Sequence, residues 1–166
     1  MKDFLVKIDI KKLVQYAVYT LVILIFQNML LSQFRPLGVC CMFLPAAVTA
    51  VAMFEGSVFS AVFAIVLGIF ADMAFIENTV TFTIAFPAIA FGIGFVSRFF
   101  INRQFMAYMI AAFFSLAAVA VIQILKTSAA DVWSVSMIPT AILQVLWSLP
   151  PAALVYFWPA SRAKVQ

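Results

Sequence analysis

The feature that most constrains this chain is a succession of six long apolar runs separated by short polar segments. Of the 166 residues, 67% are hydrophobic and only 10% are charged, which leaves too few charges to coat a water-soluble domain. Each run approaches the roughly 20 residues that a helix needs to cross about 30 Å of hydrocarbon. The sequence therefore predicts an all-α integral membrane protein, a bundle of six transmembrane helices. The runs cover residues 13–32, 39–54, 57–75, 80–97, 105–125 and 134–158.

Three parts of the chain follow from these runs. Residues 1–12 are expected to form a basic, amphipathic cytoplasmic segment, 13–158 the transmembrane domain and 159–166 a cytoplasmic tail. The first run is longer than the apolar core of a typical signal peptide and is not followed by a small-x-small cleavage site, so we expect it to stay as a membrane anchor. The connections "EGS" and "IENT" are too short for a soluble domain.

The basic residues that flank the runs predict the orientation. Basic residues in short loops are retained on the cytoplasmic side, and here they gather on one side. The other side has only Arg35 and Lys126, together with the acidic residues Asp72, Glu77 and Asp131. Both termini are therefore expected in the cytoplasm. The basic residues of the cytoplasmic side are Lys2, Lys7, Lys11, Lys12, Arg98, Arg103, Arg162 and Lys164.

The composition also argues against several classes of function. Histidine is absent and the only cysteines are the adjacent pair Cys40 and Cys41, so no residue set suits zinc, haem or an iron–sulfur cluster. We expect no cofactor. The net charge of +4 has no basic stripe or RNA-binding motif behind it, so no nucleic-acid partner is expected.

The third run, "SVFSAVFAIVLGIFAD", combines a stripe of small residues with an aspartate near its end. Small side chains allow helix backbones to approach closely in lipid, so this helix is expected to pack against protein. Asp72 must then avoid lipid, and Lys126 and Arg35 are candidate cationic partners. Alternatively, Asp72 simply ends the helix among lipid headgroups. The stripe consists of Ser57, Ala61, Ala64, Gly68 and Ala71.

Glu55 and Gly56 form the turn before the third run, where the glutamate can reach water and the glycine supplies a tight turn. The fifth run has a second small-residue face, and Gln123 near its end is expected to bond to a neighbouring helix. Prolines inside the apolar runs are expected to kink their helices. The small-residue face is formed by Ala107, Ala111, Ser115 and Ala118, and the prolines are Pro45, Pro87, Pro139, Pro150 and Pro151.

The order of short motifs resembles a known family. A first helix ends in "FQNML", and "FRP" follows at 34–36, "EG" at 55–56 and "GIFAD" at 68–72. A fourth helix closes in "SRFFINRQ", and "VLWSLPP" comes late in the chain. This arrangement is similar to the rod shape-determining protein MreD family, small proteins of the bacterial inner membrane. It covers most of the chain at the level of spacing and hydropathy.

The resemblance implies a non-enzymatic scaffold of the cell-elongation machinery, placed as a multi-pass protein in the inner membrane. Such a scaffold would bind the membrane helix of an MreC-type bitopic protein and organise a RodA-type glycosyltransferase and a penicillin-binding transpeptidase. It would also imply a fold similar to the substrate-binding components of energy-coupling factor transporters. Partner-binding or structural roles would fall on Arg35, Pro36, Glu55, Gly56, Gly68, Asp72 and Lys126.

Two alternatives remain open at this point. The first is a vitamin-binding subunit of an energy-coupling factor transporter, whose pocket would use polar residues on the outer side. The second is a membrane enzyme acting on lipid, with Glu55 or Asp72 as a general base, although no second catalytic group is evident. The outer polar residues are Arg35, Asp72, Glu77, Lys126, Asp131 and Trp133.

Overall fold

The computed structural model describes residues 10–31, 41–74, 80–99, 104–129 and 137–163. Within these ranges the chain forms six α-helices and one π-helical segment, and no strand. The elements are α1 (Ile10–Ile25), η1 (Phe26–Leu31), α2 (Leu44–Glu55), α3 (Ser57–Ala74), α4 (Thr81–Phe99), α5 (Phe105–Ala129) and α6 (Met137–Ala163). The predicted all-α class is confirmed.

Two of the five prolines that were expected to kink their helices lie at helix starts instead. Pro45 and Pro139 lie in the first turns of α2 and α6, where a missing N–H leaves no intrahelical bond unmade. The predicted kinks at these two positions are therefore wrong, and α2 starts later than the sequence suggested. Pro87 lies inside α4, and Pro150 and Pro151 lie inside α6.

Two helices are long and apolar enough to cross a membrane, over Phe105–Ser128 of α5 and Met137–Phe157 of α6. Only 39% and 17% of these stretches is buried within the protein, so much of their apolar surface faces outward. The other apolar helices are shorter, with stretches of 10–17 residues. By length alone the structure supports two spans, and the six-span topology stays a prediction.

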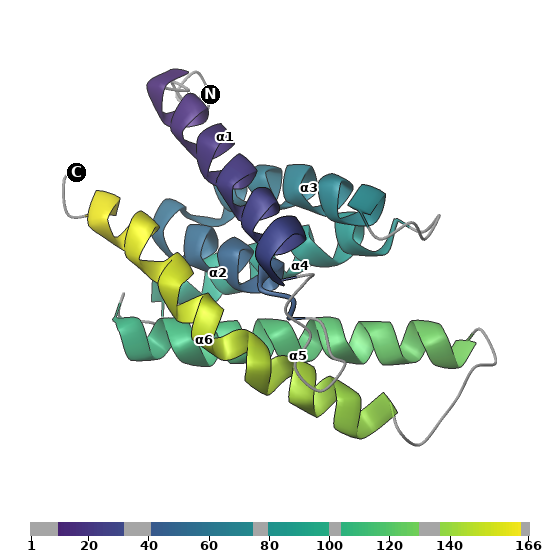
Figure 1. Cartoon of the computed structure of the whole chain (residues 1–166). Helices are drawn as coiled ribbons and strands as arrows, with labels where there is room; N and C mark the ends of the chain where they lie inside the picture. The colour runs from purple at the N-terminus through teal and green to yellow at the C-terminus, as the bar shows by residue number, and fades with distance from the viewer. Residues whose placement is uncertain (1–9, 32–40, 75–79, 100–103, 130–136, 164–166) are drawn as a thin grey trace, which may run out of the picture.

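The helix α2 forms the centre of the bundle. Every residue from Leu44 to Met53 is buried, and the helix contacts α3, α4, α5 and α6. Twelve residues extend only about 18 Å, less than the hydrocarbon thickness, so α2 depends on the surrounding helices rather than on lipid. Figure 1 shows it enclosed by the longer elements.

The outer helices pair in sequence order. The antiparallel pair α3 and α4 packs along one side of α2 and makes the most extensive contact between any two helices, while α5 and α6 pair on another side. One core cluster joins α1, α2, α3 and α4, and a second joins α2, α5 and α6 around Tyr108.

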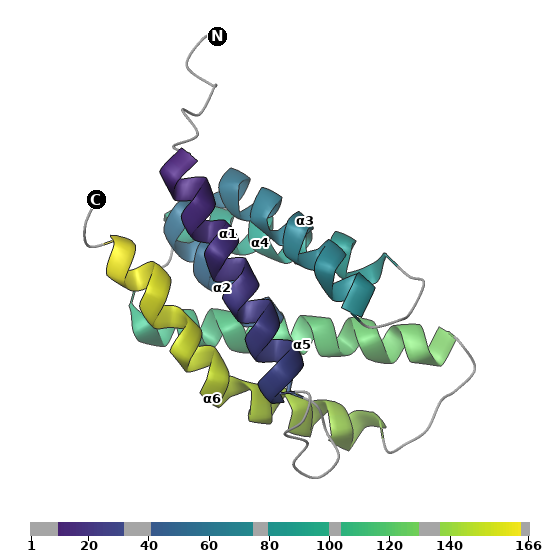
Figure 2. The same cartoon turned by 45° about the horizontal axis from the view of Figure 1, so that its top comes forward.

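The helix α1 crosses over the others and continues directly into η1 (Figure 2), and its backbone makes few close contacts with α2 to α6. Its buried side chains form a narrow seam, whereas most of its remaining apolar side chains face outward. Figures 1 and 2 both place the start of α1 and the end of α6 toward the same end of the bundle.

Candidate functional site

Asp72 on α3 caps the beginning of α4. Its Oδ1 accepts a hydrogen bond from the backbone N–H of Phe82 at 3.0 Å. Its Oδ2 accepts from the N–H of Thr83 at 2.8 Å and from the Thr83 hydroxyl at 2.6 Å. Phe82 and Thr83 are the second and third residues of α4, whose N–H groups have no partner within a helix. The carboxylate therefore performs from α3 the task of an N-cap residue.

A cap from a neighbouring helix is needed because Val80, which directly precedes α4, has no side-chain acceptor. A negative charge is also favourable at this end of a helix dipole. The donors to Asp72 in the described part of the chain are thus groups of α4, and Lys126 in the last turn of α5 is not among them. Arg35, the other proposed partner, lies outside the described residues.

Gly68 lies one turn before Asp72 and contacts the same two residues of α4. A Cβ at Gly68 would meet the carbonyl oxygen of Phe82 and the Cα of Thr83, each at 2.7 Å. These are backbone atoms that cannot rotate away, so the position requires glycine. The "GIFAD" motif therefore places one turn of α3 on the first turn of α4, with Gly68 allowing the approach and Asp72 making the bonds.

A second close approach holds the opposite end of this helix pair. A Cβ at Gly94 of α4 would lie 2.8 Å from the Cα of Ser57, the first residue of α3. Between the two ends, Ala64 and Ala71 are fully buried. The predicted packing of the small-residue stripe against protein is confirmed, and its partner is α4. Gly92 differs, because a Cβ there would meet no atom within 4 Å.

Glu55 and Gly56 form the junction between α2 and α3. Gly56 adopts a φ of 85°, which glycine accommodates without strain, and joins the two helices as a single residue. The predicted tight turn is confirmed. The Glu55 carboxylate accepts a 2.6 Å hydrogen bond from the hydroxyl of Tyr16 on α1, so it also ties α1 to the end of α2.

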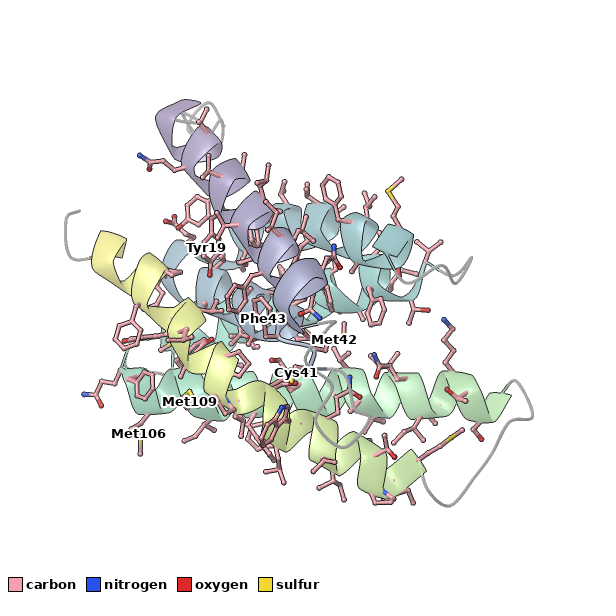
Figure 3. The ribbon with its side chains drawn as sticks, viewed as in Figure 1. Tyr19, Cys41, Met42, Phe43, Met106 and Met109 are labelled. Atoms are coloured by element: carbon pink, nitrogen blue, oxygen red, sulfur yellow. The ribbon has the colours of Figure 1, made fainter. Side chains whose placement is uncertain are left out.

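Side chains of two other elements satisfy the non-helical entry to α2. The Gln27 amide on η1 donates to the Cys41 carbonyl at 2.8 Å and accepts from the Phe43 N–H at 3.3 Å. The Ser148 hydroxyl on α6 accepts from the Met42 N–H at 3.0 Å. Figure 3 shows Cys41, Met42 and Phe43 together in the middle of the bundle. Irregular backbone in a membrane needs partners from the protein itself, and these side chains meet that requirement.

Sequence reasoning missed both Gln27 and Ser148. The available signal was a single polar side chain inside an otherwise apolar run, since such residues in membrane helices usually bond to a neighbour. Gln123 carried the same signal and was expected to contact a neighbouring helix. Its amide donates to the Met42 sulfur at 3.4 Å, so its partner lies in the non-helical entry to α2 rather than in a helix.

Two carbonyls of α6 that prolines leave without a helical donor contact side chains of other elements. Pro151 cannot donate to the carbonyl of Trp147, and the Cys41 thiol approaches that oxygen at 3.7 Å. Pro159 likewise leaves the carbonyl of Val155, which accepts from the hydroxyl of Tyr19 on α1 at 3.3 Å. The prolines of α6 thus create attachment points for α1 and for the entry to α2.

A small cavity lies between the start of α2, α5 and α6, lined partly by Met42, Gln123, Gln144 and Ser148. It has room for about one water molecule. A vitamin-sized ligand needs a pocket of roughly 300 Å³ or more. Of the outer polar residues, Arg35, Glu77, Asp131 and Trp133 lie outside the described residues, as does Pro36.

The described carboxylates are not arranged as a catalytic pair. Glu55 precedes α3 and Asp72 lies near its other end, about 25 Å away along the helix. No three metal-ligating His, Cys, Asp or Glu side chains gather within the described ranges. What this arrangement does chemically is to join α3 to α4, α1 to α2 and the entry of α2 to α6.

Comparison of the chain with protein-family models, with curated proteins and with solved structures finds no match.

Proposed function

We propose that this protein is a multi-pass membrane scaffold of the bacterial cell-elongation machinery, of the MreD type. In this role it binds an MreC-type bitopic membrane protein and organises a RodA-type glycosyltransferase and a penicillin-binding transpeptidase in the inner membrane. Peptidoglycan synthesis belongs to those partners. The proposal rests on the order of the motifs together with the way this chain uses its polar side chains.

The observation that carries the proposal is that polar side chains of the motifs form hydrogen bonds between helices. Asp72 bonds to α4 and Glu55 bonds to α1. Among the described residues, every buried side-chain nitrogen or oxygen has a hydrogen-bond partner within the chain. A site that binds a polar substrate needs polar groups directed into a pocket, whereas a scaffold needs a fixed shape.

The outer surface supports a membrane location. Large apolar side chains are exposed on α1, α3, α4, α5 and α6, for example Val18, Ile69, Ile84, Phe114 and Leu154. Exposed apolar surface on this scale marks contact with a membrane or another protein. We therefore assign the outward faces of these helices to lipid and to partner helices, with α2 enclosed at the centre.

Affinity purification after gentle crosslinking in native membranes tests the proposal. Mass spectrometry of the captured proteins and small molecules should recover MreC, RodA and a penicillin-binding transpeptidase. Recovery of paired ATPases with a coupling protein, or of a bound vitamin, would instead assign the chain to an energy-coupling factor transporter.

Two glycine variants give the matched control for this experiment. Gly68→Ala should reduce partner recovery because it separates α3 from α4, while Gly92→Ala leaves the bundle intact and adds only one methyl group. Equal recovery with both variants, at equal protein amounts, would remove the α3–α4 junction from the basis for partner binding.

A further inference from the structure

The attachment of α1 differs along its length. Its C-terminal end continues into η1, where the buried Gln27 amide bonds to the backbone on both sides of Met42. A π-helical segment is rare and often marks a functional site. This end of α1 is therefore fixed to the entry of α2 by two hydrogen bonds that no water competes for.

The rest of α1 is attached through side chains, and Tyr16, Tyr19 and Ile23 are buried in the core cluster shared with α2, α3 and α4. The Tyr16 hydroxyl reaches the Glu55 carboxylate, and the Tyr19 hydroxyl reaches the Val155 carbonyl. Their rings pack on Phe59 and Phe63 of α3, with centroids 5.0 to 6.2 Å apart. Tyr19 lies between α1 and the helices below it in Figure 3.

Close backbone contact between α1 and the helices α2 to α6 is sparse. The seam of α1 consists of the buried residues Tyr16, Tyr19, Thr20 and Ile23 rather than of a small-residue stripe. In lipid, tight association depends on close backbone approach. Here large rings separate the helix backbones, and the two hydroxyl groups add the directed hydrogen bonds of this contact.

The geometry points to a strap: α1 pivots on η1 and is latched onto α2 and α6 by the hydroxyls of Tyr16 and Tyr19. When the latch opens, α1 swings away as one unit and uncovers the Glu55 carboxylate, the Val155 carbonyl and the rings of Phe59 and Phe63. The α3–α4 junction and the core around Tyr108 do not involve α1 and stay in place, whereas the buried side chains of Tyr16, Tyr19 and Ile23 leave the core cluster that they share with α2, α3 and α4. This inference does not depend on the proposed function.

Distances between spin labels measured in lipid nanodiscs test the strap. One label is placed on α1 through Val14→Cys and the other on α6 through Leu154→Cys, both at exposed positions, with Cys40 and Cys41 changed to alanine. In the Tyr16→Phe/Tyr19→Phe variant, a second population at longer distance should appear. Each lost hydrogen bond raises the ratio of open to closed α1 about fivefold, so the loss of both raises that ratio about 25-fold.

The matched control removes a hydroxyl from the body of the bundle. Tyr108 donates to the carbonyls of Ala46 and Ala152 at 3.3 and 2.8 Å, so Tyr108→Phe makes the same chemical change away from α1. It should leave the Val14–Leu154 distances unchanged. A second label pair on Ile25 and Leu154, near the pivot, should shift less than the first pair.

Two results would overturn the strap. An unchanged Val14–Leu154 distribution in the double tyrosine variant would show that the hydroxyls do not latch α1. A longer distance in Tyr108→Phe as well would show a general loosening of the bundle rather than movement of α1 alone.

Discussion

The α3–α4 pair and α1 are attached in opposite ways. The two helices of the pair touch backbone to backbone at Gly68 and Gly94, and the Asp72 carboxylate closes one end. The helix α1 instead reaches its neighbours through tyrosine rings and hydroxyls. A backbone contact at glycine leaves less room for adjustment than a contact through long side chains. The difference predicts that mutations in the pair cost more stability than mutations in the seam of α1.

The largest effect is expected for Gly68→Ala. The added methyl group meets two backbone atoms at 2.7 Å, so the pair must separate, and we expect a loss of about 3 kcal/mol in the free energy of unfolding. Unfolding in mixed detergent micelles measures it. Gly92→Ala, which meets open space, should be neutral or stabilising by up to about 1 kcal/mol.

A smaller loss is expected for Asp72→Ala. The change removes three hydrogen bonds and leaves the N–H groups of Phe82 and Thr83 without their acceptor, which should cost about 2 kcal/mol. Asp72→Asn keeps one acceptor oxygen and should lose about half as much. Unfolding of Asp72→Ala at the parent's midpoint would contradict the role of the carboxylate as a cap.

Gly94→Ala tests the other end of the pair. Its Cβ would meet the Cα of Ser57 at 2.8 Å, but Ser57 directly follows the turn at Gly56 and can shift with the start of α3. We expect a loss of about 1 kcal/mol in the same assay. A loss equal to that of Gly68→Ala would show that the two ends of the pair are equally rigid.

The smallest effect is expected for Tyr19→Phe. The ring and its packing on Phe63 remain, and the hydroxyl bond to the Val155 carbonyl is lost, at a cost of about 0.5 to 1 kcal/mol. Thermal denaturation followed by circular dichroism can rank this variant against the three above. A greater loss than for Asp72→Ala would reverse the contrast between α1 and the pair.

The sequence predicted the helices and the packing face of α3 because apolar periodicity and small-residue spacing are local signals. It also predicted that Asp72 would need a polar partner. The identity of that partner could not be predicted, because it is the backbone of the next helix. Every residue except proline has a backbone N–H, so the sequence does not single out the donors. Gln27 and Ser148 stand out as polar side chains in apolar runs, but their partners could not be predicted either, because both bond to main-chain groups at the entry of α2.

The prolines show a similar limit. Pro45 and Pro139 were placed inside helices because the apolar runs continue on both sides of them. The first residue of each helix depends on which backbone N–H groups find hydrogen-bond partners. Hydropathy gives no information about these partners. The length of α2 follows from the same competition, because its entry is satisfied by side chains from η1 and α6 rather than by another helical turn.

A double-mutant cycle between Asp72→Ala and Thr83→Ala tests most directly whether the Asp72 carboxylate serves α4. The carboxylate and the Thr83 hydroxyl are 2.6 Å apart, so removing either group should remove the same interaction. The two losses in unfolding free energy should then be non-additive by about 1 kcal/mol or more. Losses that add to within about 0.3 kcal/mol would show that the two groups act independently and would contradict the side-chain bond between Asp72 and Thr83 at the α3–α4 junction.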